Sequence, residues 1–340
     1  MMAIGAFKPY FASFASFADQ SRWRISTPGA LCLRRPRASP RMPPRSKPAC
    51  RMRTILVSGP LLILSAGAPA QGAPDWLGLD GFEFASPPAS FRFTDLDLRD
   101  PHVFLPITIA PLPTICFDFT DSAIPTTTVS FNGSIQASYT SDSNPADGFL
   151  DASSLLWFRP LAQDGRVGRV DNGPADCLAP APTSGCAPRT GAEPTAYTYA
   201  AAASGNCLAP IPGTIGVPAY SPAIGTPAAP CFTTAPKTFV FDNNGTAITL
   251  VDAQIAASFS GNPATALNQG LLRGFLREAD ANQIVISDPN LPGGSVTLAS
   301  LLPGGSGSCS SRNDKDQYQG ESGWWFHFNF SATPVVYTGP

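Results

Sequence analysis

The sequence predicts a mainly β protein, built as an antiparallel β-sandwich or an open barrel. Many short runs of β-prone residues alternate with Gly, Pro and Asn turn signals, as in sandwiches and barrels. The run 323–332 places aromatic residues at every second position, which is the period of a strand. Six cysteines follow a segment that resembles an export signal, which is typical of disulfide-bonded extracellular domains.

Residues 52–70 have the three parts of a secretory signal peptide. A basic start at Arg53 precedes an apolar stretch that is shorter than the ~20 residues of a membrane-spanning helix. Ala68 and Ala70 then occupy the small-residue positions of a cleavage site. We therefore expect cleavage after Ala70, no transmembrane anchor in the mature protein, and a secreted or periplasmic location.

Residues 1–51 precede this signal and are Arg- and Pro-rich without apolar periodicity, so we interpret them as a spurious or disordered extension, with translation starting at Met52. The first 53 residues hold 11 basic residues and one acidic residue, so the rest of the chain has 11 basic and 23 acidic residues. This acidic balance argues against nucleic acid as a partner, because phosphate neutralisation supplies most of the non-specific affinity for it.

Residues 71–340 are expected to form one secreted β-rich domain with an internal duplication. The segments 126–159 and 246–277 share an Ile-x-Ala-Ser-aromatic motif, followed by Asn-Pro-Ala and an apolar pair before Arg. In the first copy, Asn132-Gly133 predicts a hairpin turn. In the second copy, the alternation from Ala253 to Phe259 predicts a strand.

One short helix is expected in each copy, because Asn-Pro-Ala supplies a helix cap and a proline at the first helical position. For residues 262–280 a strand remains the alternative, since Gly270 and Gly274 disfavour a helix.

Residues 160–236 separate the two copies and are rich in Pro, Ala, Gly, Ser and Thr. Such a composition cannot bury a continuous core, so we interpret the segment as a Cys/Pro-rich insertion that leaves the sheet, with one short strand at 195–200. The expected disulfides are the sequence-near pairs Cys177–Cys186 and Cys207–Cys231, which leave Cys116 with Cys309.

Five further short strands are expected: 103–110, 114–119, 282–287, 295–300 and 323–332. In the last of them, Trp324, Phe326, Phe328 and Phe330 share a face that should be core. The opposite face holds Trp325, His327 and Asn329, our candidate ligand-binding residues, which could stack a sugar ring or a small apolar ligand. The alternative is that this face packs on the helix of the duplicated unit or on the Cys-rich insertion.

Carboxylates gather in three Asp-rich stretches, around Asp97, Asp147 and Asp314. Oxygen-rich loops can hold calcium weakly, so Asp314 and Asp316 are the candidate metal ligands; no other cofactor is expected. Paired carboxylates could also hydrolyse a glycosidic bond.

The chain has only two histidines, and no residue pattern in it predicts a catalytic residue. The sequence therefore favours an exported, non-enzymatic protein of the cell envelope or the medium, with a binding or structural role. The alternative is a secreted hydrolase that acts on carbohydrate through its Asp-rich loops. The sequence specifies neither the ligand nor the oligomeric state.

Overall fold

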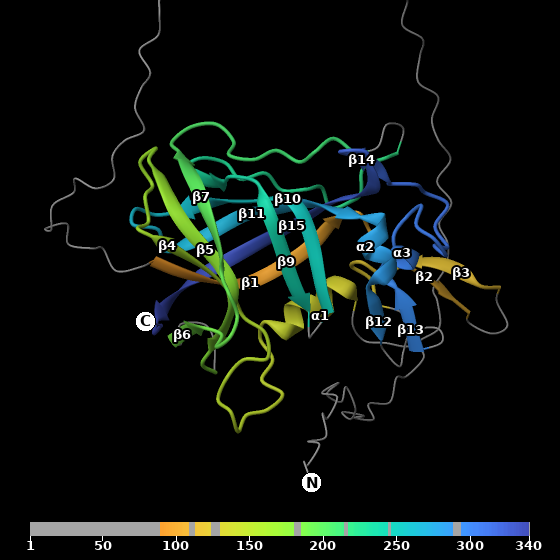
Figure 1. Ribbon diagram of the computed structural model, residues 1–340, viewed down its shortest axis with the longest axis horizontal. Coiled ribbons are helices and arrows are strands. Elements are labelled where there is room, and N and C mark those ends of the chain that lie inside the picture. Colours follow the sequence, from red (N-terminus) through yellow and green to blue (C-terminus); the bar gives the residue numbers. More distant parts are fainter. Residues whose placement is uncertain are drawn as a thin grey trace, which may run out of the picture. The chain divides into compact units, whose positions relative to one another are not determined.

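The computed structural model describes residues 89–108, 113–123, 130–179, 185–213, 217–243, 246–287 and 294–339. The predicted extension 1–51 and signal peptide 52–70 lie outside these residues. Within them the chain is mainly β, as the sequence predicted (Figure 1).

Eight strands form an antiparallel barrel in which each strand pairs with the next one of the barrel along the chain, and β15 pairs with β1. The barrel strands are β1 (Ala89–Asp100), β4 (Ser154–Arg159), β5 (Val167–Cys177), β7 (Thr195–Ala202), β8 (Cys231–Thr234), β10 (Thr246–Ser260), β11 (Ala266–Arg277) and β15 (Glu321–Tyr337). Pairing of the first strand with the last leaves the barrel without an open edge between them.

Other elements lie around the barrel. Three strands extend the same sheet: β6 (Gly185–Pro188), β9 (Lys237–Asn243) and β14 (Asp316–Tyr318). Two separate hairpins are formed by β2 (Phe104–Ile107) with β3 (Ile115–Asp118), and by β12 (Val285–Ser287) with β13 (Ser295–Thr297). The helices are α1 (Phe131–Ser138), α2 (Glu278–Gln283) and α3 (Leu298–Leu301). Figure 1 shows the two hairpins, α2 and α3 gathered on one side of the barrel.

The barrel interior is filled by aromatic and aliphatic side chains. The predicted core face of β15 is confirmed, because Trp324, Phe326, Phe328 and Phe330 are all buried in one hydrophobic cluster. Phe93 of β1 stacks on Phe330 with ring centroids 4.6 Å apart. An eight-stranded barrel is just wide enough for side chains to fill it, so this interior is a packed core.

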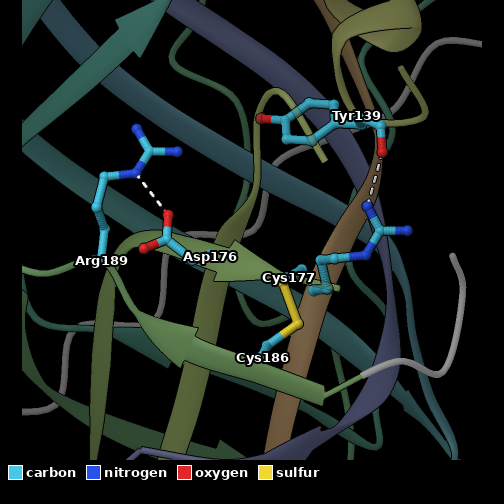
Figure 2. Close-up of a disulfide and its surroundings, with 6 residues drawn as sticks. Tyr139, Asp176, Cys177, Cys186 and Arg189 are labelled. Carbon is cyan, nitrogen blue, oxygen red and sulfur yellow. Dashed lines mark hydrogen bonds and ion pairs between the residues drawn. A yellow bond between two sulfur atoms is a disulfide. The ribbon is translucent and has the colours of Figure 1, made fainter. Parts of the chain in front are cut away.

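All three predicted disulfides are present: Cys116–Cys309, Cys177–Cys186 and Cys207–Cys231. Figure 2 shows the Cys177–Cys186 bridge between β5 and β6, next to the ion pair of Asp176 and Arg189, whose Oδ1 and Nε lie 3.0 Å apart. These intramolecular bridges fit a secreted or periplasmic protein.

The predicted hairpin turn at Asn132-Gly133 is wrong, because both residues lie in α1. Ser130 caps this helix by accepting a hydrogen bond from the Gly133 amide. The Asn132 side chain bonds both backbone groups of Leu98, at 2.8 and 3.0 Å, and thereby joins α1 to β1. A long-range contact therefore overrides the local turn preference of Asn-Gly.

The expectation of one helix after each Asn-Pro-Ala motif is also wrong. In the second copy, strand β11 follows and continues to Arg277 before the short helix α2 begins. In the first copy the structure has a turn and then β4, while α1 precedes the motif. The matched residues Ile135 and Ile255 lie in a helix and a strand, so the two segments do not share one local structure.

The segment 160–236 is not simply an excursion from the sheet, because it contributes β5, β7 and β8 to the barrel. The short strand expected at 195–200 is confirmed as part of β7. A small residue is required at Gly168, because a side chain there would collide with the ring of Tyr199, its partner on the neighbouring strand β7. Residues 203–213 and 217–230 leave the barrel between β7 and β8.

Candidate functional site

A long segment between β7 and β8 lies on the outside of the barrel and runs from β7 towards β14 (Figure 1). We call its described residues, 203–213 and 217–230, the outer strap. One end is fixed by the Cys207–Cys231 disulfide. Its apolar contact with the barrel is made by Leu208 and Ile224, which pack with Ala256 and Leu271.

The three candidate ligand-binding residues lie on the outward face of β15, and the outer strap contacts two of them. The backbone N–H of Ile211 donates to His327 Nε2 at 3.1 Å. The Asn329 amide pairs with both backbone groups of Gly225, at 2.7 and 3.0 Å. Trp325 lies beyond these contacts and is half-buried. The segment that contacts this face is thus part of the Cys-rich insertion, the alternative that the sequence left open.

Trp325 belongs to a small aromatic group. Its ring centroid lies 4.9 Å from that of Tyr318 on β14 and 5.4 Å from that of Phe275 on β11, both in edge-on arrangements. Phe275 is fully buried, whereas Tyr318 and Trp325 keep part of their surface exposed. Trp325 and Asn329 thus keep part of their surface exposed, whereas His327 is buried.

His102, which follows β1, is held by groups from two other parts of the chain. Its Nδ1 lies 2.6 Å from the Asp118 carboxylate at the end of β3. Its ring stacks on Tyr220 of the outer strap, with centroids 3.8 Å apart and planes at 10°. The ionised carboxylate can only accept a hydrogen bond, so Nδ1 carries the proton and donates it to this bond, and the neutral ring has its lone pair on Nε2.

Tyr220 also contacts the loop that precedes β14. Its hydroxyl donates to Asp314. The Arg312 guanidinium lies over the Tyr220 ring, with its central carbon 4.0 Å from the ring centroid. Arg312 further donates to the Pro218 carbonyl at 2.7 Å. We call Asp100, His102, Asp118, Tyr220, Arg312 and Asp314 the His102 cluster.

The Cys116–Cys309 disulfide explains how distant segments supply this cluster. Cys116 lies two residues before Asp118, and Cys309 lies three residues before Arg312. The bridge joins positions 193 residues apart and so holds the β2–β3 hairpin against the 302–315 loop. A bridge that closes such a long loop makes the unfolded chain less disordered than it would be without the bridge. The lower entropy of the unfolded state favours the folded arrangement.

Burial sets the charge state of the acidic groups. Desolvation, together with the nearby Asp314, raises the pKa of Asp100 to about 7. Burial also raises the pKa of Asp314, although the hydrogen bond from Tyr220 and the charge of Arg312 oppose this change. Burial acts in the same direction on Asp118, but the bonds from His102 and Thr120 outweigh it and lower the pKa of that carboxyl.

This arrangement has the parts of an acid–base site. Asp118 orients the His102 ring, as a carboxylate orients the imidazole of a general base, and Nε2 is buried without a hydrogen-bond partner. Asp100 is a carboxyl that holds its proton up to about neutral pH. However, His102 is only 5% exposed and lies under Tyr220, so a substrate would reach Nε2 only if the outer strap moved.

The two candidate metal ligands, Asp314 and Asp316, differ in burial and in their surroundings. Asp314 is buried and bonds Tyr220 and Arg312, whereas Asp316 begins β14 and is half-buried. Across the described parts of the chain, no group of three or more His, Cys, Asp or Glu side chains is arranged to hold a metal ion.

Sequence reasoning missed Asp118, Tyr220 and Arg312 as members of a cluster. None of them lies in a recognisable motif, and Tyr220 is more than a hundred positions from His102. The available signal was the rarity of histidine, since both histidines of the chain contact the outer strap. Asp100 and Asp314 belong to two of the Asp-rich stretches, and the fold brings these stretches together.

The fold and the cluster thus define a disulfide-bonded, eight-stranded antiparallel barrel with an outer strap. No protein-family model, no curated protein and no solved structure matches this chain. Among the residues that the structure describes, none of the helices has the length and apolar character needed to cross a membrane.

Proposed function

We propose that this chain is an exported, non-enzymatic protein of the cell envelope or the medium, with a structural or binding role. The observation that carries this proposal is that the side chains of the His102 cluster contact one another and link separate parts of the chain. His102, just after β1, contacts Asp118 of β3 and Tyr220 of the outer strap, and Tyr220 in turn contacts the 302–315 loop through Arg312 and Asp314. The ionisable side chains of the cluster therefore join peripheral segments to the barrel. The three disulfides and the signal-like segment 52–70 support export.

A binding role would use the exposed side of Trp325. Aromatic rings with a polar margin stack sugar rings and small apolar ligands, and Trp325 has Tyr318 beside it. We expect Trp325→Ala to weaken binding of a soluble polysaccharide in affinity electrophoresis, with Phe149→Ala, an exposed aromatic residue outside the barrel strands, as the control variant. Equal retardation of all three proteins would contradict a role for Trp325.

The second candidate is the secreted carbohydrate hydrolase, and the raised pKa of Asp100 beside His102 favours it. The experiment that separates the two measures reducing ends released from a panel of polysaccharides. The proposed function predicts no release by the wild-type protein. Release that is lost in Asp100→Asn and His102→Gln, but kept in Asp164→Asn, would establish the hydrolase instead. Asp164 is a suitable control because its side chain is 58% exposed and forms an ion pair with the exposed Arg166.

A further inference from the structure

The outer strap is held on the barrel by a hydrogen bond that depends on protonation. The Ile211 N–H donates to His327 Nε2, so this nitrogen must carry a lone pair. In the neutral ring the proton is then on Nδ1. If a second proton binds, Nε2–H faces the Ile211 N–H, and two donors point at each other. The bond at this position is therefore lost on protonation.

The surroundings of His327 control when that proton binds. The side chain is 1% exposed on β15; burial and the positive charge of Arg273 on β11 lower its pKa to about 4. From β1, an Asp100 carboxyl oxygen lies 4.0 Å from Nδ1. Asp100 is in turn influenced by Asp314, His102, Arg312 and Asp316, and it carries its proton below about pH 7. Near pH 4 it therefore offers His327 no full negative charge.

The remaining contacts of the strap differ in their sensitivity to acid. The hydrogen bonds between Asn329 and Gly225 join neutral groups, so acid does not break them. The Cys207–Cys231 disulfide does not titrate either. Arg273 donates to the Ala209 carbonyl and stays charged throughout. Protonation of Asp314 weakens its contacts with Arg312 and with the Tyr220 hydroxyl, but these contacts lie at the Tyr220 end of the strap. His327 is the acid-sensitive contact at the 203–213 end.

We propose that the outer strap is an acid-released cover of the barrel's outer face, with His327 as its latch. Protonation frees the 203–213 part while the Cys207–Cys231 bridge keeps it attached. Release uncovers His327 and the part of Ala256 and Leu271 that Leu208 covers, while Ile224 and Gly225 stay in place. The barrel core lies on the other side of these strands and is not involved.

Amide hydrogen exchange of the oxidised, purified protein between pH 7 and pH 3 tests this. The released ring regains the ordinary histidine pKa of about 6.5, whereas the closed state keeps a pKa of about 4. We therefore expect the protection factor of the Ile211 amide to fall by up to about tenfold per pH unit between these two values and to level off below about pH 4, because opening takes up one proton only in that range. The Leu272 amide of β11 should stay protected over the same range. His327→Gln should keep Ile211 protected at pH 3, since the Gln carbonyl accepts at any pH. Asp164→Asn, which changes a side chain that is 58% exposed and pairs with Arg166, should behave as the wild type does.

Three results would overturn the proposal: protection of Ile211 at pH 3 in the wild type, equal loss in His327→Gln, or simultaneous loss of protection at Leu272, which would mean global unfolding. A second measurement needs no variant. Nitrogen-15 shifts of the His327 ring at pH 7 should show the proton on Nδ1, and a proton on Nε2 would exclude the latch.

Discussion

At the scale of single residues, ionisation of the Asp100 carboxyl is costly in the folded protein. Its side chain is 25% exposed, yet its pKa is raised from 3.8 to about 7, chiefly by burial and by Asp314. A raised folded-state pKa means that the folded protein binds the proton more tightly than the unfolded chain does. The resulting stability is complete below about pH 4 and is lost as the pH rises to 7.

We therefore expect Asp100→Asn to be more stable than the wild type by about 2 kcal/mol at pH 8, and equally stable near pH 4. Urea unfolding at the two pH values measures the difference. Asp164→Asn is the control, because removing an exposed ion pair should change the free energy of unfolding by less than about 1 kcal/mol at either pH. Destabilisation by Asp100→Asn at pH 8 would show that its carboxylate is paired favourably.

At the scale of elements, the pairing of β11 with β15 depends on a glycine. Gly270 lies opposite Phe330, and a Cβ atom added there would come within 2.5 Å of the Phe330 ring. Gly274 is similarly close to Leu250 and Ala253. In the sequence, these two glycines disfavoured a helix at this position. In the strand, both are required because the neighbouring strands approach too closely to leave room for a side chain.

We expect Gly270→Ala to destabilise the barrel by about 1–3 kcal/mol, because Phe330 must leave its position against Phe93. Gly213→Ala is the matched control, since nothing lies within 4 Å of the added atom. Thermal unfolding followed by near-UV circular dichroism reports both. A neutral Gly270→Ala would mean that Phe330 shifts without loss of packing.

At the scale of the whole molecule, export and disulfide formation make a joint prediction. Of the eight cysteines, Cys32 and Cys50 precede the predicted cleavage site, and the other six form the three disulfides. The natural mature protein should begin at Gln71 and, when denatured without reductant, show no thiol that reacts with Ellman's reagent. Intact mass measurement checks both points. Peptides from residues 5–41, or free thiols throughout, would contradict export and the disulfide assignment.

Patterns local in sequence predicted much of the fold. The alternation in 323–332 placed Trp324 and His327 on opposite faces of β15 correctly, because side chains of a strand alternate whatever its partners are. Cysteine spacing gave the three disulfides. In contrast, Asn132-Gly133 was misread, since its helix is stabilised by bonds to Leu98, and no local signal reports a contact that distant.

The candidate site was less predictable than the fold. Trp325, His327 and Asn329 were placed on one face, but the segment that contacts two of them is more than a hundred residues earlier in the chain. His102 acquires its environment from Asp118 and Tyr220, which only the closed barrel and the Cys116–Cys309 bridge bring together.

By itself, the sequence determined that this chain is mainly β and which strand face of 323–332 is buried, because the period of a strand is a property of neighbouring residues. Only the tertiary structure decided that eight strands close into a barrel, that the outer strap covers its face, and that Asp100 holds a proton near neutral pH. Closure, covering and desolvation each depend on groups that meet in space from distant parts of the chain.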